Sequence, residues 1–101
     1  MPITITRQDG GLTIALSGEL DHHGAREMMA QLDDAIAARL PARLTLDLSG
    51  VTFMDSSGIA VLLRAHRQMV HTGGSLRAVN LPAQARRVLD AAGIGRLISL
   101  D

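Results

Sequence analysis

Cysteine, lysine, tryptophan and tyrosine are all absent from this chain of 101 residues. Without cysteine there are no disulfides, no thiolate metal ligands and no cysteine nucleophile, which fits a reducing compartment. Phe53 is the only Phe, Tyr or Trp, so the chain has no aromatic platform on which the bases of single-stranded nucleic acid would stack. The core must therefore be built from aliphatic side chains and methionine.

Charge of one sign and long hydrophobic runs are also missing. Ten arginines balance ten acidic residues, and no segment concentrates either sign, which favours neither DNA nor an anionic membrane as a partner. No apolar run approaches the roughly 20 residues that cross a bilayer, and the start MPITITRQDG lacks the basic-then-apolar pattern of a signal peptide. We expect a soluble cytoplasmic domain whose partner is another protein.

The length and the hydrophobic content of 47% suit one domain, residues 1–101, with a single core of modest size. Near its start, apolar residues alternate with polar ones over Ile3–Thr6 and again over Leu12–Leu16. Asp9-Gly10-Gly11 lies between the two segments and has the composition of a turn. These segments predict an N-terminal hairpin.

Apolar residues at a helical period predict three amphipathic helices. The first runs from about Asp21, a candidate N-cap, to Leu40, where Pro41 forbids continuation. The second follows the segment 55–58 and ends at the turn 71–74, with an expected buried face of Ile59, Leu62, Leu63, His66 and Val70. The third starts at Pro82 and ends at Gly93, with an apolar stripe of Ala85, Val88, Leu89 and Ala92.

Three further strands are predicted between and after these helices. Leu44–Leu48 alternates cleanly, and Val51 and Phe53 extend its buried pattern beyond an irregularity at Ser49-Gly50. Residues 76–79 and 97–100 supply the other two. The order of elements predicts an α/β domain with a small mixed sheet of four to five strands. Three helices leave one sheet face less well covered, and we expect that face or its edge to be available for association.

The segment Asp55-Ser56-Ser57-Gly58 separates a predicted strand from a predicted helix. One interpretation is structural, because Asp and Ser are preferred N-caps and glycine lets the chain turn sharply. The other is functional, because open α/β sheets place working residues at the carboxyl ends of parallel strands. A phosphoryl group on one of these serines would also lie near the amides of a helix start.

Enzymatic and metal-binding interpretations of the same residues are weak. The segment lacks the first glycine of the Gly-x-Ser-x-Gly nucleophile elbow, and His66 lies on the apolar stripe of the following helix. His22 and His23 are adjacent, so they point to different sides and cannot easily share a metal ion. We expect both to be exposed in the first turn of the first helix, with no metal, no cofactor and no catalytic residue.

The chain resembles the anti-sigma-factor antagonists, the bacterial members of the sulfate transporter and anti-sigma-factor antagonist (STAS) domain family. The resemblance covers nearly all of the sequence and rests on separated segments in the right order. They are LSGELDHH at 16–23, LTLDL at 44–48, FMDSSGI at 53–59, AVN at 78–80 and LDAAGI at 89–94.

This resemblance implies that Ser56 is phosphorylated by a partner that is both serine kinase and anti-sigma factor. Asp21 and Asp55 are implied to help dock that kinase or to position the serine, and with Ser56, Ser57 and Gly58 they form the expected partner-binding residues. ATP then belongs to the kinase, the chain is a substrate rather than an enzyme, and a phosphatase reverses the modification. Two alternatives stay open: a constitutive binding or scaffold module, and a small enzyme that uses Ser56 or the histidines.

Reasoning from the residues alone does not choose between the two serines. At about 100° per residue, the expected buried face puts Ser57 nearly opposite its centre and Ser56 only about 60° from it. If Ser57 is the N-cap, however, Ser56 lies outside the helix and a helical wheel says nothing about it. The resemblance favours Ser56, with Ser57 as its rival.

Overall fold

A computed structural model describes residues 3–8 and 10–101. Its elements, in chain order, are β1 Ile3–Gln8, β2 Gly11–Leu20, α1 His22–Arg39, β3 Arg43–Met54, α2 Ser56–His71, β4 Ser75–Val79, α3 Ala83–Ala91, the short 3-10 helix η1 Ile94–Arg96 and β5 Ser99–Leu100. The predicted alternation of strands and helices after a hairpin is confirmed. Asp9, which was predicted to lie in the hairpin turn, is outside the described residues.

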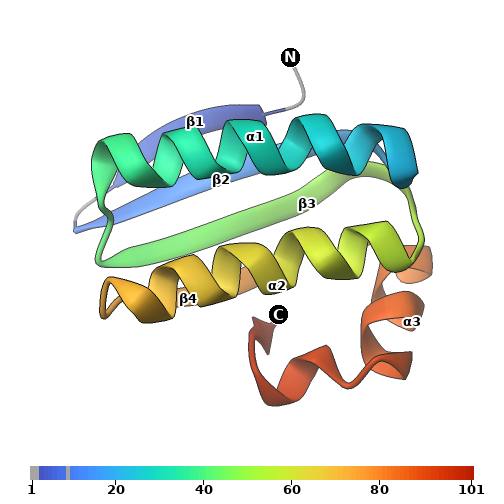
Figure 1. Cartoon of the computed structure of the whole chain (residues 1–101). Coiled ribbons are helices and arrows are strands. Elements are labelled where there is room, and N and C mark those ends of the chain that lie inside the picture. Colours follow the sequence, from blue (N-terminus) through green and yellow to red (C-terminus); the bar gives the residue numbers. More distant parts are fainter. Residues whose placement is uncertain (1–2, 9) are drawn as a thin grey trace.

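One five-stranded sheet has the order β1-β2-β3-β4-β5. β1 runs antiparallel to β2, with Ile5 opposite Ile14, and the remaining neighbours are parallel. Helices α1 and α2 lie side by side over one face of this sheet, while α3 lies at the carboxyl end of β3 (Figure 1). The predicted α/β fold with a mixed sheet is therefore confirmed.

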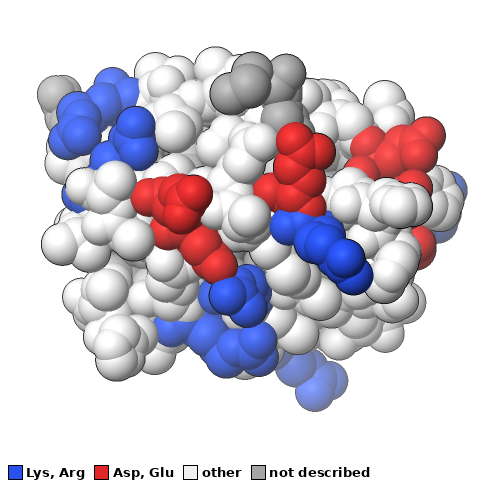
Figure 2. All heavy atoms as spheres, turned by 45° about the horizontal axis from the view of Figure 1, so that its top comes forward, with Lys and Arg blue, Asp and Glu red and all other residues white. Residues whose placement is uncertain are grey.

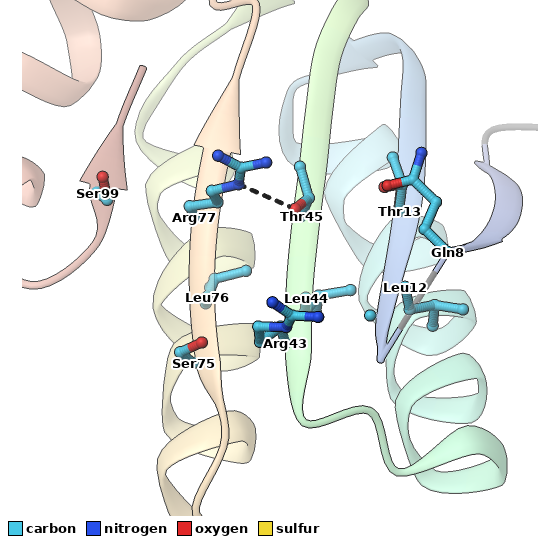
Figure 3. A pocket seen from close by; sticks show the side chains of 11 residues that line it. Gln8, Leu12, Thr13, Arg43, Leu44, Thr45, Ser75, Leu76, Arg77 and Ser99 are labelled. Carbon is cyan, nitrogen blue, oxygen red and sulfur yellow. Dashed lines mark hydrogen bonds between the residues drawn. The ribbon is translucent and has the colours of Figure 1, made fainter.

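The opposite face of the sheet is polar and hollowed. A hollow of about 900 Å³ is lined there by Gln8, Thr13, Thr45 and Arg77 among others. Figure 3 shows these side chains with α1 and α2 behind the sheet, and the Nε of Arg77 donates a hydrogen bond to the Oγ1 of Thr45 at 3.1 Å. The expectation of a less well covered face is confirmed, and its use in association stays a prediction.

The core lies between the sheet and the helices and is aliphatic, as predicted. Leu44, Leu46 and Leu48 expose at most 1% of their surface because alternate residues of β3 point toward α1 and α2. Phe53 does not continue this pattern. It is 43% exposed, so the prediction that it joins the buried row is wrong, whereas Val51 is buried as expected.

Two irregularities in the pairing of β2 with β3 explain the exposure of Phe53. Ala15 and Ser17 pair with Asp47 and Gly50, so β3 carries one extra residue there, at the predicted Ser49-Gly50 irregularity. Gly18 and Glu19 then pair with Val51 and Phe53, so Thr52 is a second extra residue. Each extra residue shifts the alternation of β3 by one position. The second shift turns Phe53 outward and Met54 inward.

α1 has the predicted N-cap and the predicted end. Asp21 has an extended backbone, and its Oδ1 accepts a hydrogen bond from the N–H of Gly24 at 2.8 Å. At the other end Leu40 adopts a left-handed conformation, with φ of 45°, and donates its N–H to the carbonyl of Ile36. The helix therefore ends just before Pro41, as the sequence predicts.

Several other boundaries differ from the predictions. β2 continues to Leu20 rather than Leu16, because its parallel pairing with β3 extends to the end of both strands. The last strand is only Ser99–Leu100, since η1 precedes it and leaves Leu97 55% exposed. In α3, Ala92 is exposed rather than part of the apolar stripe, because the helix ends at Ala91.

Candidate functional site

The candidate site is the start of α2, where Asp55 is the N-cap. Its backbone is extended, and its Oδ1 accepts a hydrogen bond from the N–H of Ser57 at 2.8 Å. Its own N–H donates to the carbonyl of Leu20 at 3.4 Å, which ties the turn to the end of β2. Ser56 is thus the first residue of the helix, where an N–H has no partner within the helix.

The buried face of α2 is not the one that the sequence predicts. It consists of Gly58, Val61, Leu62, Ala65 and Met69. Val70 was expected to be buried and is 59% exposed. The prediction was wrong because half-buried apolar residues beside the buried face, such as Ile59 and Leu63, repeat at the same helical spacing as the buried residues. Spacing alone could not tell the two rows apart.

This rotation of the helix changes the comparison of the two serines. From Gly58, at the centre of the buried face, Ser56 lies about 160° away and Ser57 about 100°. Ser56 is exposed and Ser57 is half-buried. The wheel based on the predicted face therefore favoured Ser57 wrongly, and the more accessible hydroxyl is that of Ser56.

Gly58 lies within the helix and does not make a left-handed turn. Among the described residues, the glycines with positive φ are Gly10, Gly18, Gly73 and Gly93. A Cβ on Gly58 would collide with the Cγ of Met54 and lie 3.0 Å from its Sδ. Because Met54 is completely buried, the helix start can approach the end of β3 only if position 58 carries no side chain.

The start of α1 repeats this arrangement beside the first. Leu20-Asp21-His22-His23-Gly24 and Met54-Asp55-Ser56-Ser57-Gly58 share the spacing apolar, Asp, x, x, Gly, and Leu20 pairs with Met54 in register. Gly24, like Gly58, allows close packing, since a Cβ there would collide with the carbonyl oxygen of Glu19. We call the segments 21–24 and 55–58 the paired helix starts. Sequence reasoning missed this repeat, although the shared spacing is visible in the sequence.

His22 and His23 occupy the positions in α1 that Ser56 and Ser57 occupy in α2. Both histidines are exposed in the first turn of the helix, as predicted, and their rings lie edge to face with centroids 6.4 Å apart. Within residues 3–8 and 10–101, no three His, Cys, Asp or Glu side chains are grouped so that they could hold a metal ion.

The paired helix starts bring two carboxylates, Asp21 and Asp55, to adjacent strand ends. The hydrogen bond from the Gly24 N–H is the main cause that lowers the pKa of Asp21 below its usual value of 3.8. Each carboxylate also neutralises part of the positive end of its helix dipole. Elsewhere acidic and basic side chains are interspersed on the face that Figure 2 presents, without a continuous area of either sign.

Gln84 of α3 supports the site from the edge of β3 opposite β2. This contact was not predicted from the sequence. The N–H of Met54 donates to the Oε1 of Gln84 at 2.8 Å, and the Nε2 of Gln84 donates to the carbonyl of Met54 at 2.7 Å. The two residues are 30 positions apart, and no local pattern marks the contact. Gln84 thereby holds the residue that precedes the N-cap of α2.

Comparison with known proteins assigns this fold to a family. The chain belongs to the STAS domain family, since residues 3–99 match the family model described as "Mlab, STAS domain". The anti-sigma F factor antagonist of Paenibacillus polymyxa is 32% identical over 100 residues, which cover 99% of this chain and 86% of that protein. No helix in the described part of the chain is both long and apolar enough to span a membrane.

Two solved structures of SpoIIAA share the fold. The anti-sigma factor antagonist SpoIIAA in its unphosphorylated form matches with a TM-score of 0.80 and 25% identity, over 98% of this chain and 87% of that one. The Bacillus cell fate determinant SpoIIAA in the phosphorylated form matches with a TM-score of 0.71 and 25% identity, over 98% of this chain and 90% of that one.

Proposed function

We propose that this chain is an anti-sigma-factor antagonist that acts by partner switching, as a single cytoplasmic STAS domain. Its unmodified form binds an anti-sigma factor and releases the client of that factor. Phosphorylation of Ser56 ends this binding. The anti-sigma factor supplies the serine kinase activity and the ATP, and a phosphatase restores the hydroxyl, so the chain is a substrate and a ligand rather than an enzyme.

The accessibility of Ser56 is the observation that carries this proposal. Ser56 is exposed at the first position of α2, and the Asp55 cap holds the backbone around it. A kinase can reach such a hydroxyl without opening the core. The chain that carries this segment is similar over almost its whole length to an anti-sigma F factor antagonist.

The remaining residues of the paired helix starts complete the contact with the partner. Asp21 and Asp55 directly follow Leu20 and Met54, which pair in register, so two acidic groups lie at the end of the sheet where α2 begins with Ser56. Ser57 continues the surface along the first turn of α2, and Gly58, which is buried, contributes indirectly by keeping that turn close to β3. We assign docking of the anti-sigma factor to these residues.

Phosphorylation should act on the interface rather than on the fold. It adds about −1.5 to −2 charges at pH 7. The attraction of an exposed helix start for that charge is typically below about 1 kcal/mol, whereas a like charge or a desolvated phosphate inside an interface costs several times more. The loss of binding therefore outweighs any gain in stability. That SpoIIAA in both forms matches the fold of this chain supports a switch without refolding.

The test is a kinase assay with purified proteins. Each anti-sigma factor encoded in the same genome is incubated with this chain and ATP, and the product is analysed by mass spectrometry. We expect one phosphate, which is lost in Ser56→Ala and kept in Ser57→Ala. The reverse pattern would assign the switch to Ser57, and transfer to neither serine by any of these factors would leave a constitutive binding module.

A further inference from the structure

The position of Phe53 leads to a second inference, which rests on the proposed function. We infer that Phe53 is the apolar anchor through which the chain binds its anti-sigma factor. Its ring inserts into an apolar pocket of the partner, beside the contact made by the paired helix starts. Phe53 is the only aromatic side chain apart from histidine, and it is 43% exposed.

The exposure of Phe53 has a specific structural cause. Val51 and Met54 are buried, and Thr52 is the extra residue that shifts the alternation of β3 between them. Without that extra residue Phe53 would share the inward face with Val51. Bulges occur often beside functional sites, where they redirect a side chain. This one turns the largest apolar side chain of the strand outward, three residues before Ser56.

Phe53 is distinguished by its location from the other large apolar side chains that are exposed. These are Leu40, Val70 and Leu97. Val70 lies in the last turn of α2, and at about 1.5 Å per residue that is about 20 Å from Ser56 along the helix axis. Leu40 follows the end of α1, which is also the end away from the paired helix starts. Phe53 alone among them lies on the strand that leads into Asp55.

The proposed contact otherwise lacks an apolar centre. The residues assigned to docking are Asp21, Asp55, Ser56, Ser57 and Gly58, which are acidic, hydroxylated or without a side chain. Protein interfaces concentrate binding energy in a few buried aromatic or Arg residues surrounded by polar groups. Phe53 supplies such a centre, continuous with the docking residues along the chain.

The experiment measures affinity for the anti-sigma factor that phosphorylates Ser56 in the kinase assay. The titrations are made without ATP, so that Ser56 stays unmodified in every variant. We expect Phe53→Ala to weaken binding about 30-fold, which corresponds to about 2 kcal/mol. Val70→Ala and Leu97→Ala, which also remove exposed apolar side chains, should bind as tightly as their parent. Thermal unfolding of each variant checks that the fold is retained.

A second experiment, photocrosslinking, tests the contact while an aromatic group is kept at position 53. With benzoylphenylalanine in place of Phe53, irradiation should link the chain to the anti-sigma factor, whereas the same group in place of Val70 should not. Binding unchanged by Phe53→Ala, or equal crosslinking from both positions, overturns the anchor and leaves the proposed function intact. If no anti-sigma factor binds the parent protein, the proposed function fails and the anchor fails with it.

Discussion

Gln84 and Met54 are joined by two hydrogen bonds that use both polar groups of the side-chain amide and both polar groups of the Met54 backbone. The pairing of β4 with β3 ends at Asp47 and Val79, so the later part of β3 has no strand on that side. Gln84 takes the place of a neighbouring strand at Met54. α3 is thereby attached to the residue from which the start of α2 is built.

We predict that Gln84→Ala destabilises the fold by about 2 kcal/mol. It leaves the N–H and carbonyl of the buried Met54 without their partners, and each unsatisfied buried group costs about 1–3 kcal/mol. Chemical denaturation measures the change. Gln8→Ala, at an exposed glutamine of β1, should change stability by less than about 0.5 kcal/mol. Equal stability of the two variants would contradict this role of Gln84.

We predict that Gly58→Ala destabilises the fold by about 1–3 kcal/mol, although alanine favours helix more than glycine by about 1 kcal/mol. The added methyl group would overlap the side chain of Met54, which has no exposed surface toward which to move. Gly95→Ala is the matched control, because a Cβ there meets only Leu100 at 3.8 Å. Thermal unfolding of both variants decides the prediction, and a stabilised Gly58→Ala would refute it.

We predict that part of the stability near pH 7 depends on the charge of Asp21. The pKa of this carboxyl is lower in the folded chain than its usual value, mainly because the Gly24 N–H donates to the carboxylate. Its contribution is therefore fully present well above pH 3.8 and is lost as pH falls through the lower folded value.

Asp21→Asn tests this pH dependence, because asparagine also caps helices but does not titrate. Denaturation experiments between pH 7 and pH 2 should show that wild type has a higher free energy of unfolding than Asp21→Asn at neutral pH. The difference should shrink in acid. A difference between the two proteins that stays constant over the whole range would rule out this source of stability.

We predict that a negative charge at position 56 leaves the fold intact. At the first residue of α2, Ser56→Asp should stabilise the helix by about 0.3–1 kcal/mol through its dipole, and Ser56→Arg should destabilise it by a similar amount. Circular dichroism and thermal unfolding at low salt measure both effects. A loss of folded structure in Ser56→Asp would contradict a switch that acts only on binding.

Much of the fold could be predicted from the sequence, because it depends on local patterns. Leu44, Leu46 and Leu48 alternate, and Asp21 precedes a helical period, so the strand, the helix and its cap were predicted correctly. Phe53 was misplaced because periodicity assumes an unbroken alternation, and the extra residue Thr52 is visible only in the register between two strands. Gln84 was missed because a hydrogen bond over 30 positions leaves no local pattern.

The candidate site could likewise be predicted only where it depends on a local pattern. The segment containing Ser56 was found from its composition and its place after a strand. Which serine is exposed depended on how α2 is rotated about its axis, and the helical period alone allowed two faces that share Leu62. Packing against the sheet selected the face centred on Gly58. α2 packs with this face inward because Gly58 has no side chain. A search for apolar residues does not detect such a position.

The packing of Gly58 on Met54 has a consequence for how the family varies. The two positions share one volume, so a side chain at 58 requires a smaller one at 54, whereas a smaller side chain at 54 alone would leave a cavity. Across STAS domains that keep this strand-to-helix geometry, we expect these two positions to covary. A lineage that enlarges position 58 without a compensating change must move the start of α2, and with it the serine in the first turn of that helix.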